Sequence, residues 1–240
     1  MKIKIYNSPA ETIQHLADYF VTIAKQCIED NGRFTVALSG GSSPKKLYEL
    51  LSSELYKNAL DWKKVYFFFG DERYVPLTDE SSNYLMAKKA LFEPLQIADD
   101  HVFAVDTSLP PDDAAKDYES RMKVFFGNES IRLDLVLLGL GDNSHTASLF
   151  PHTTVLHDKV PAVKALFVEE INAYRVTMNA PLINESRHVA FLVYGKEKAS
   201  AVHHILQDKT DIEKFSAQLI TPNSGELIWF LDNEAAEKVR

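Results

Sequence analysis

Four apolar runs, each ending on glycine, constrain the fold of this chain more than any other feature of its sequence. They are RFTVALSGG (33–41), KVYFFFG (64–70), LDLVLLG (133–139) and HVAFLVYG (188–195). Segments with helical patterns separate them, and this alternation is typical of a parallel sheet buried on both faces. The sequence therefore predicts an α/β fold: a Rossmann-like, mostly parallel sheet with helices on both faces, in a single domain spanning residues 1–240.

The segments between these runs supply the remaining elements. Ser8, followed by Pro9 and Glu11, predicts the start of a helix that has Cys27 on its apolar stripe and ends at Gly32. Further helices are expected at 44–56, 83–91, 110–127 and 196–206, with a short one at the C-terminus. Further strands are expected at 2–6, 101–106, 163–170, 174–179 and 226–232. The pair within 163–179 alternates in polarity, as half-exposed or edge strands do.

The composition excludes several classes of protein. The chain has 240 residues, 45% of them hydrophobic, but no apolar run near the roughly 20 residues that a membrane helix needs. Its N-terminus, MKIKIYNSPAE, lacks the apolar segment of a secretion signal, and its one cysteine cannot form an internal disulfide. We therefore expect a cytoplasmic protein without membrane contacts. A formal net charge of −8 with scattered basic residues argues against a nucleic-acid partner, and the histidine spacing matches no standard metal site.

The loops that follow the apolar runs are candidates for one shared site, because ligands of such sheets bind beyond the carboxyl ends of the strands. The first loop, SGGSSPKK (39–46), would offer free backbone N–H groups and the hydroxyls of Ser39, Ser42 and Ser43 to an anion. Its spacing differs from that of a nucleotide P-loop, so a phosphate monoester fits better than a triphosphate. A plain helix cap before Pro44 would use the same amides.

The second loop, GDERYVP (70–76), places three charges directly after a buried strand. Charges are costly in such a place unless they are paired or bind a ligand. Arg73 could form two hydrogen bonds with a phosphate or carboxylate, and Asp71 could orient substrate hydroxyls or act as a base. An internal ion pair at the edge of the sheet is the alternative interpretation.

The third loop, within GLGDNSHTASLFPH (139–152), presents Asn143, Ser144 and His145 immediately after a buried strand. We expect His145 to begin a short helix, TASLF, that Pro151 ends. The positive end of that helix would lower the pKa of the imidazole and keep it neutral, as a general base requires. A histidine that only caps or fills a turn is the simpler alternative.

Three further cationic residues come late in the chain. Arg175 lies in YRVTMN (174–179), and Lys196 and Lys198 follow Gly195 at the first turn of a helix. A lysine there opposes the helix dipole, which makes sense if an anion lies between the lysine and the helix. The sequence leaves open which of the two lysines would contact that anion, and a solvated surface lysine is the alternative.

In combination, these motifs resemble those of the 6-phosphogluconolactonases, in the wider superfamily that includes glucosamine-6-phosphate deaminase. The motifs are SGGSSP, GDERYVP with the later SNY (82–84), GLGDNSHTASLFP and, more weakly, YRVTM and GKEKA. The resemblance spans nearly the whole chain. It implies hydrolysis of 6-phospho-D-glucono-1,5-lactone to 6-phosphogluconate, the second step of the oxidative pentose phosphate pathway. It also implies no organic cofactor and no covalent intermediate.

By position, the resemblance assigns catalytic roles to three residues. His145 would activate a water molecule for attack on the lactone carbonyl, and Asp71 would hold ring hydroxyls or assist that base. Asn143 stands where the family usually has an aspartate, and it can form hydrogen bonds but cannot take a proton. The substrate and its phosphate would be held by Ser39, Gly40, Gly41, Ser42, Ser43, Arg73, Arg175 and Lys198.

Two other functions remain as alternatives. The deaminases resemble this chain less, because they use a glutamate soon after the histidine, whereas here no acidic residue follows His145 until Asp158. A non-catalytic sugar-phosphate-binding protein would keep Ser42, Arg73 and Lys198 but would not need His145. The sequence does not fix the oligomeric state.

Overall fold

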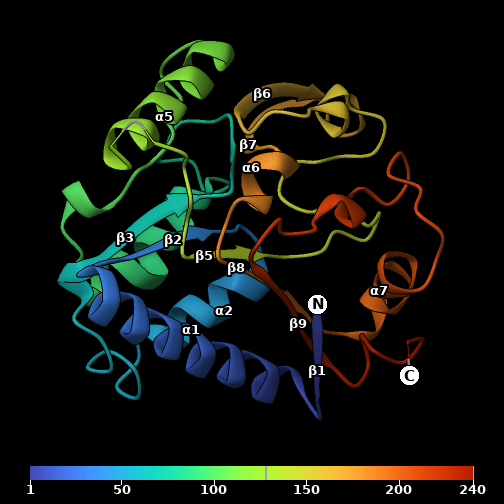
Figure 1. The fold of residues 1–240 in the computed structure, drawn as a ribbon, viewed down its shortest axis with the longest axis horizontal. Coiled ribbons are helices and arrows are strands. Elements are labelled where there is room, and N and C mark those ends of the chain that lie inside the picture. Colours follow the sequence, from blue (N-terminus) through green and yellow to red (C-terminus); the bar gives the residue numbers. More distant parts are fainter. Residues whose placement is uncertain (128, 240) are drawn as a thin grey trace.

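The computed structural model of the protein describes residues 1–127 and 129–239. In this part of the chain, six parallel strands form one sheet in the order β1-β9-β8-β5-β2-β3 (Figure 1). The strands are β1 (Lys2–Tyr6), β2 (Phe34–Leu38), β3 (Val65–Phe69), β5 (Leu135–Leu138), β8 (His188–Val193) and β9 (Glu226–Asp232). The four glycine-ended runs supply β2, β3, β5 and β8, so the predicted parallel sheet is confirmed.

The inner strands are apolar throughout because both of their faces are covered. Every residue of β2 and of β5 is buried. Successive side chains point to opposite faces: Val36 and Leu38 belong to the hydrophobic cluster on one side, and Ala37 belongs to the cluster on the other. These runs show no alternation of polar and apolar residues in the sequence because both faces of the strands are buried.

Helices cover both faces, as predicted (Figure 1). One face carries α1 (Pro9–Asn31), α2 (Ser42–Leu51) and a helical segment made of α3 (Asn83–Ala87), a π-helical turn (Lys88–Phe92) and α4 (Glu93–Leu95). The other face carries α5 (Pro111–Phe125), α6 (Ala180–Asn184) and α7 (Ala199–Leu206). None of the described helices is long and apolar enough to cross a membrane.

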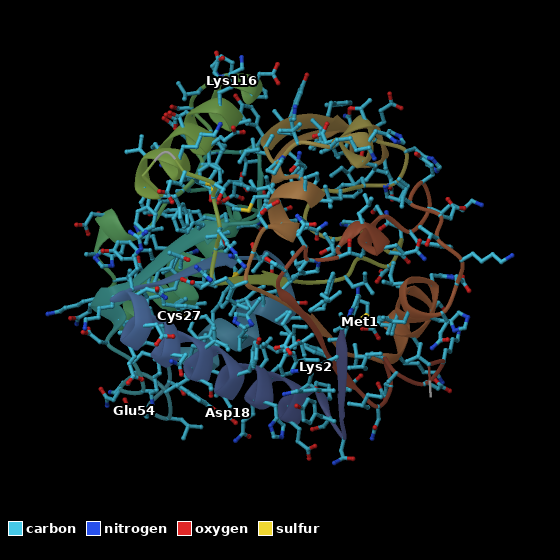
Figure 2. The ribbon with its side chains drawn as sticks, in the orientation of Figure 1. Met1, Lys2, Asp18, Cys27, Glu54 and Lys116 are labelled. Carbon is cyan, nitrogen blue, oxygen red and sulfur yellow. The ribbon has the colours of Figure 1, made fainter. Side chains whose placement is uncertain are left out.

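The ends of α1 follow the expected capping chemistry. The hydroxyl of Ser8 accepts a hydrogen bond from the Glu11 N–H group, and Gly32 ends the helix with a left-handed φ of 76°. Cys27 is buried between α1 and the sheet, whereas Lys116 is exposed on the outer side of α5 (Figure 2). Burial raises the pKa of the Cys27 thiol to about 12, so Cys27 is a core residue, as expected.

A second, antiparallel sheet lies beside the first. Within the described residues it contains three strands in the order β4 (Asp71–Arg73), β7 (Ala173–Met178) and β6 (Val163–Val168). The predicted strands at 163–170 and 174–179 are confirmed as the hairpin β6–β7. The sequence did not predict β4, because three consecutive charged residues carry no apolar alternation; their strand forms only through pairing with β7.

Two elements predicted outside the pocket loops are absent. The expected strand at 101–106 is reduced to a single bridge between Phe67 and Val102, since the Ala104 carbonyl then accepts from the guanidinium of Arg121. The expected C-terminal helix is a series of turns over 233–238. The side chain of Asp232 accepts the N–H groups of both Ala235 and Gly195, so it ties this segment to the loop after β8.

The strand order determines where a ligand can bind. β2 and β5 are neighbours. The next strand of this sheet after β2 is β3, which lies on the far side of β2, and the next strand after β5 is β8, which lies on the far side of β5. The loops that follow these two strands therefore diverge and leave a crevice at the carboxyl edge of the sheet.

Candidate functional site

A pocket of about 450 Å³ occupies this crevice, a size suited to a small ligand. Ten of the eleven residues predicted for the site line it: Ser39, Gly40, Gly41, Ser42, Ser43, Asp71, Arg73, His145, Arg175 and Lys198. The eleventh, Asn143, contacts His145 from outside the lining. The structure thus brings the motifs together in one place, as expected from the four glycine-ended runs.

The turn after β2 offers backbone groups to the pocket. Gly41 has a φ of 105°, in the left-handed region, and provides no side-chain cap, so α2 begins at Ser42 with unpaired N–H groups. This start lies two residues before the predicted one at Pro44. Gly40 packs so closely on Asn83 that a Cβ atom at Gly40 would collide with the Asn83 side chain. The turn is therefore a cradle of N–H groups that only glycine can form.

Asp71 and Asn83 form a polar wall of the pocket. Asp71 is buried and accepts a hydrogen bond from the Ser148 hydroxyl at 2.6 Å, while the Asn83 amide donates to the Asp71 carbonyl at 2.9 Å. Among the described residues, Asn83 Oδ1 and Ser39 Oγ are buried without any hydrogen-bond partner. Unpaired buried polar atoms are unfavourable, and both atoms lie beneath the surface of the pocket, out of reach of a ligand hydroxyl.

Glu72 shows how a charged residue directly after a buried strand is stabilised. Its carboxylate is buried and accepts the backbone N–H groups of Arg73, Asn83 and Tyr84 at 2.7 to 2.8 Å. Burial raises the pKa of Glu72, and these three N–H groups act in the opposite direction. Glu72 therefore fastens β4 to the start of α3, and this contact, instead of an ion pair, places Asn83 at the pocket.

Arg73 and Arg175 lie directly opposite each other on β4 and β7. Arg73 donates to the Ser81 carbonyl and Arg175 to the Tyr174 carbonyl, and neither makes an ion pair with a described carboxylate. The alternative of an internal ion pair for Arg73 is therefore wrong. Burial lowers the pKa of Arg175, with Asp71 acting in the opposite direction, and a guanidinium remains charged at neutral pH. Two cationic side chains thus line the pocket without an ion-pair partner in the part of the chain that the structure describes.

The segment after His145 is not the predicted helix. Residues 146–150 are irregular apart from a turn at 147–148, with Ser144 at a φ of 64° and Ala147 at 48°. The Ser148 N–H group donates to the Thr177 hydroxyl of β7 and not to a carbonyl one helical turn back. Pairing with β7 therefore overrides the helical propensity of TASLF.

His145 is nonetheless kept neutral, by a different cause from the expected one. Its ring lines the pocket and stacks on Phe150 at a centroid distance of 4.0 Å. Burial, followed by the nearby charges of Lys198 and Arg175, lowers the pKa of His145 to about 4, while Asp142 acts in the opposite direction. The imidazole is therefore neutral at pH 7, with a proton on only one of its two ring nitrogens.

Asn143 lies between His145 and a residue that the sequence did not single out. Its Oδ1 accepts from the His145 backbone N–H at 3.3 Å and contacts the ring Nδ1. Its Nδ2 donates to the two carboxylate oxygens of Glu170 at 3.2 and 3.4 Å. Glu170 lies on the short turn between β6 and β7, and no local sequence signal connects it with the loop after β5.

Of the two lysines left open by the sequence, Lys198 lines the pocket and Lys196 does not. The Lys198 Nζ forms an ion pair with Asp142 Oδ1 at 2.6 Å. Lys46, which is not among the predicted site residues, also lines the pocket, with its Nζ 5.6 Å from the centre of the Tyr194 ring.

The lining has a positive balance although the chain is acidic. Its described residues include four cationic side chains (Lys46, Arg73, Arg175 and Lys198) and three acidic ones (Asp71, Asp142 and Glu197). An anionic ligand is therefore attracted locally, against a net charge of −8 for the whole chain. Among the described residues, no three histidine, cysteine, aspartate or glutamate side chains lie together as a metal site would require.

Comparison with known proteins agrees with this geometry. A model of the family described as glucosamine-6-phosphate isomerases/6-phosphogluconolactonase matches residues 7–229. The chain belongs to this family. Within the family it is similar to a 6-phosphogluconolactonase of Synechocystis sp., with 40% identity over 90% of this chain and 88% of that protein. A 6-phosphogluconolactonase of Nostoc sp. is 38% identical over 100% of this chain and 99% of that protein.

A solved structure supports the same relationship. The 6-phosphogluconolactonase from Trypanosoma cruzi superimposes with a TM-score of 0.88 at 32% sequence identity, covering 99% of this chain and 96% of that one. The similarity therefore extends over the whole fold of this family member, including the strands and loops that surround the pocket.

Proposed function

We propose that this protein hydrolyses 6-phospho-D-glucono-1,5-lactone to 6-phosphogluconate, the second step of the oxidative pentose phosphate pathway, with His145 as the general base. The observation that carries the proposal is a neutral imidazole in a pocket whose lining also holds four cationic side chains. An ester of a phosphorylated sugar acid needs this combination, because a base must activate water beside a group that holds the phosphate. The names of the family and of its relatives support the choice of substrate.

In this proposal, the substrate phosphate binds the N–H groups and hydroxyls of the Gly40–Ser43 turn together with Lys198. Arg73 and Arg175 enclose the rest of the anion, and their lack of acidic partners supports this role. Charge-assisted hydrogen bonds to phosphate are the strongest that such side chains make. Lys198 would exchange its ion pair with Asp142 for the phosphate.

The ring hydroxyls would bind on the opposite wall. Asp71, held by the Ser148 hydroxyl, would accept hydrogen bonds from the ring hydroxyls. This arrangement would hold the lactone carbonyl near His145, and such alignment contributes directly to the rate.

The chemical step needs one proton acceptor. His145 Nε2 takes a proton from water as the oxygen forms a bond with the lactone carbonyl carbon. The carbonyl electron pair moves onto oxygen, where the nearby cationic side chains and amides stabilise it. As the carbonyl re-forms, the bond from the carbon to the ring oxygen breaks, and the imidazolium returns its proton to that oxygen. The immediate product is a carboxylic acid with a free hydroxyl, and the acid then releases its remaining proton to solvent to become a carboxylate. No covalent intermediate forms.

A base with a pKa of about 4 is weak, but binding of the substrate would raise this pKa. A bound phosphate dianion would offset the charges of Lys198 and Arg175, two of the causes that lower the pKa of His145. The imidazole would thus become more basic only when substrate is present.

The test is the formation of 6-phosphogluconate from freshly generated lactone, with an enzyme-free blank because the lactone hydrolyses spontaneously. We expect turnover well above the blank, and no release of ammonia from glucosamine 6-phosphate. A rate equal to the blank would contradict the proposal. Sugar-phosphate binding without turnover would then favour a binding protein, and ammonia release would favour a deaminase.

A further inference from the structure

Glu170, Asn143 and His145 form a continuous chain of hydrogen-bonding groups that ends at the pocket. Glu170 contacts Asn143 Nδ2 with both of its oxygens, and Asn143 Oδ1 contacts the backbone N–H and the ring Nδ1 of His145. The three residues come from two distant segments, the loop after β5 and the turn between β6 and β7.

The carboxylate at one end of this chain determines the orientation of the amide in the middle. An ionised carboxylate can only accept hydrogen bonds, so the donor end of the Asn143 amide must face Glu170. The acceptor end, Oδ1, then faces His145. The opposite orientation would place two acceptors together at Glu170 and two donors together at the backbone N–H of His145.

The amide in turn determines which ring nitrogen of His145 carries the proton. Because Oδ1 only accepts, the Nδ1 that faces it must donate, and the neutral ring then has an unprotonated Nε2. Nε2 makes no hydrogen bond with any described residue, so its lone pair is available to the pocket. The ring has little freedom to turn, since it is stacked on Phe150 and packed against Gly141, where a Cβ atom would collide with it.

We infer that Glu170 is a positioning residue: through Asn143, it holds His145 in the Nδ1–H tautomer that leaves Nε2 free to accept a proton. Its role as a positioning residue in catalysis rests on the proposed lactonase function, whereas the tautomer does not. Glu170 is exposed, so its charge acts weakly on His145 through solvent. Its effect comes from orienting the amide, and the closer charges of Lys198, Arg175 and Asp142 determine the electrostatic environment of the ring.

The direct test is nitrogen-15 NMR of the histidine rings in the full-length protein at pH 7, with His145 assigned by the loss of its signals in His145→Gln. We expect the wild type to show a protonated Nδ1 and an unprotonated Nε2. Glu170→Ala is expected to give a mixture of the two tautomers. Glu169→Ala is the matched control: it removes a neighbouring exposed carboxylate that makes no hydrogen bond or ion pair with a described side chain, and it is expected to leave the wild-type spectrum unchanged.

The reciprocal exchange Asn143→Asp with Glu170→Gln sharpens the test. The introduced glutamine can donate to the introduced aspartate, which again accepts from Nδ1, so the double variant is expected to recover the single Nδ1–H tautomer. An Nε2–H tautomer in the wild type, or a Glu170→Ala spectrum identical to that of the wild type, would overturn the inference.

Kinetics separate this role from a merely structural one. We expect Glu170→Ala to lower kcat by about tenfold with KM unchanged, by analogy with the 10- to 100-fold losses that follow removal of a partner that orients a metal-bound histidine. The reciprocal double variant is expected to recover most of kcat. If the wild type shows no lactonase activity, the proposed function fails, but the NMR result still decides whether Glu170 sets the tautomer. If lactonase activity is present and the tautomer does not respond, the inference alone is wrong.

Discussion

The two glycine turns that face each other across the pocket are built on different principles. The turn after β2 continues at once into α2 and exposes unpaired N–H groups, with no side-chain cap. The turn after β5 leads into no helix, and it is held by side chains: Thr146 donates to the Gly139 carbonyl, and Asn143 contacts His145. Both turns follow neighbouring buried strands, so burial of the strand does not decide which kind of turn follows.

The difference matches what each turn has to do in the proposed reaction. Binding an anion requires several donors in a fixed arrangement, which a helix N-terminus provides with backbone alone. Proton transfer requires one side chain in one protonation state and one orientation, and this depends on partners brought from other segments. The binding turn is therefore local in sequence, whereas the catalytic turn depends on β7 and on the β6–β7 turn.

Adding one methyl group to each turn should produce the largest effects and separate the two functions. Gly40→Ala would collide with Asn83 and displace the cradle, so we expect KM to rise by about 100-fold. Gly141→Ala would collide with the His145 ring, so we expect kcat to fall by about 100-fold, the loss typical of a displacement of about 1 Å.

Gly70→Ala is the control for both, because Gly70 does not line the pocket and a Cβ atom there meets only the Leu38 carbonyl oxygen at 3.6 Å, an ordinary contact. Steady-state kinetics of the three variants would check this prediction. Equal losses in kcat and KM for Gly40→Ala and Gly141→Ala would show that the two turns do not have separate functions.

Removing the lysine that lines the pocket should have the next largest effect. Lys198→Met is expected to raise KM by about 10- to 100-fold, because a charge-assisted hydrogen bond contributes about 1.5–3 kcal/mol. Lys196→Met removes a charge two residues away that does not line the pocket, and its KM should equal that of the wild type. Similar KM values for the two variants would contradict the assignment of Lys198 to the substrate.

The pKa of His145 should respond to the charges on the binding side of the pocket. The pKa is lowered, so in the free protein the ring stays neutral as pH falls, until it gains its proton near pH 4. Lys198→Met, or saturation with 6-phosphogluconate, is expected to raise this pKa by about one unit or more, since either change offsets a nearby positive charge. An NMR titration of the assigned ring would measure the shift. An unchanged pKa in both cases would mean that the two turns are not electrostatically coupled.

The smallest effect is expected at Asp142, whose ion pair with Lys198 must open when phosphate binds. Asp142→Asn is expected to lower KM by about threefold, because an ion pair with one exposed partner contributes about 1 kcal/mol or less. Product-inhibition measurements with 6-phosphogluconate should show the same change in affinity. A higher KM would indicate that Asp142 supports substrate binding instead of competing with it.

The sequence predicts the parts of this molecule whose structure is set by local patterns. The strands β2, β3, β5 and β8 follow from continuous apolar runs, and the glycines at their ends locate the pocket. The predicted strand at 101–106 and the predicted helix after His145 fail for one reason: their backbone groups bond to partners far away in the chain. Such partners, among them Arg121 for Ala104 and Thr177 for Ser148, leave no mark on the neighbouring sequence.

The residues of the site also divide into those that local motifs predict and those that only distant contacts place there. The cradle residues and His145 stand in recognisable motifs, whereas Glu170 lies 27 positions from Asn143 in an ordinary acidic turn. Asn83 appeared in the sequence as part of a helix start, and only the fold shows that its Oδ1 is unpartnered beside Gly40.

The measurement that tests the account most directly is kcat for lactone hydrolysis by the wild type and by His145→Gln, each corrected for the enzyme-free blank. Glutamine keeps polar bulk at the pocket wall but cannot take a proton at neutral pH. We expect His145→Gln to lower kcat by about 10²- to 10⁴-fold, with KM close to that of the wild type. A variant that retains wild-type kcat would contradict the role of His145 as the general base.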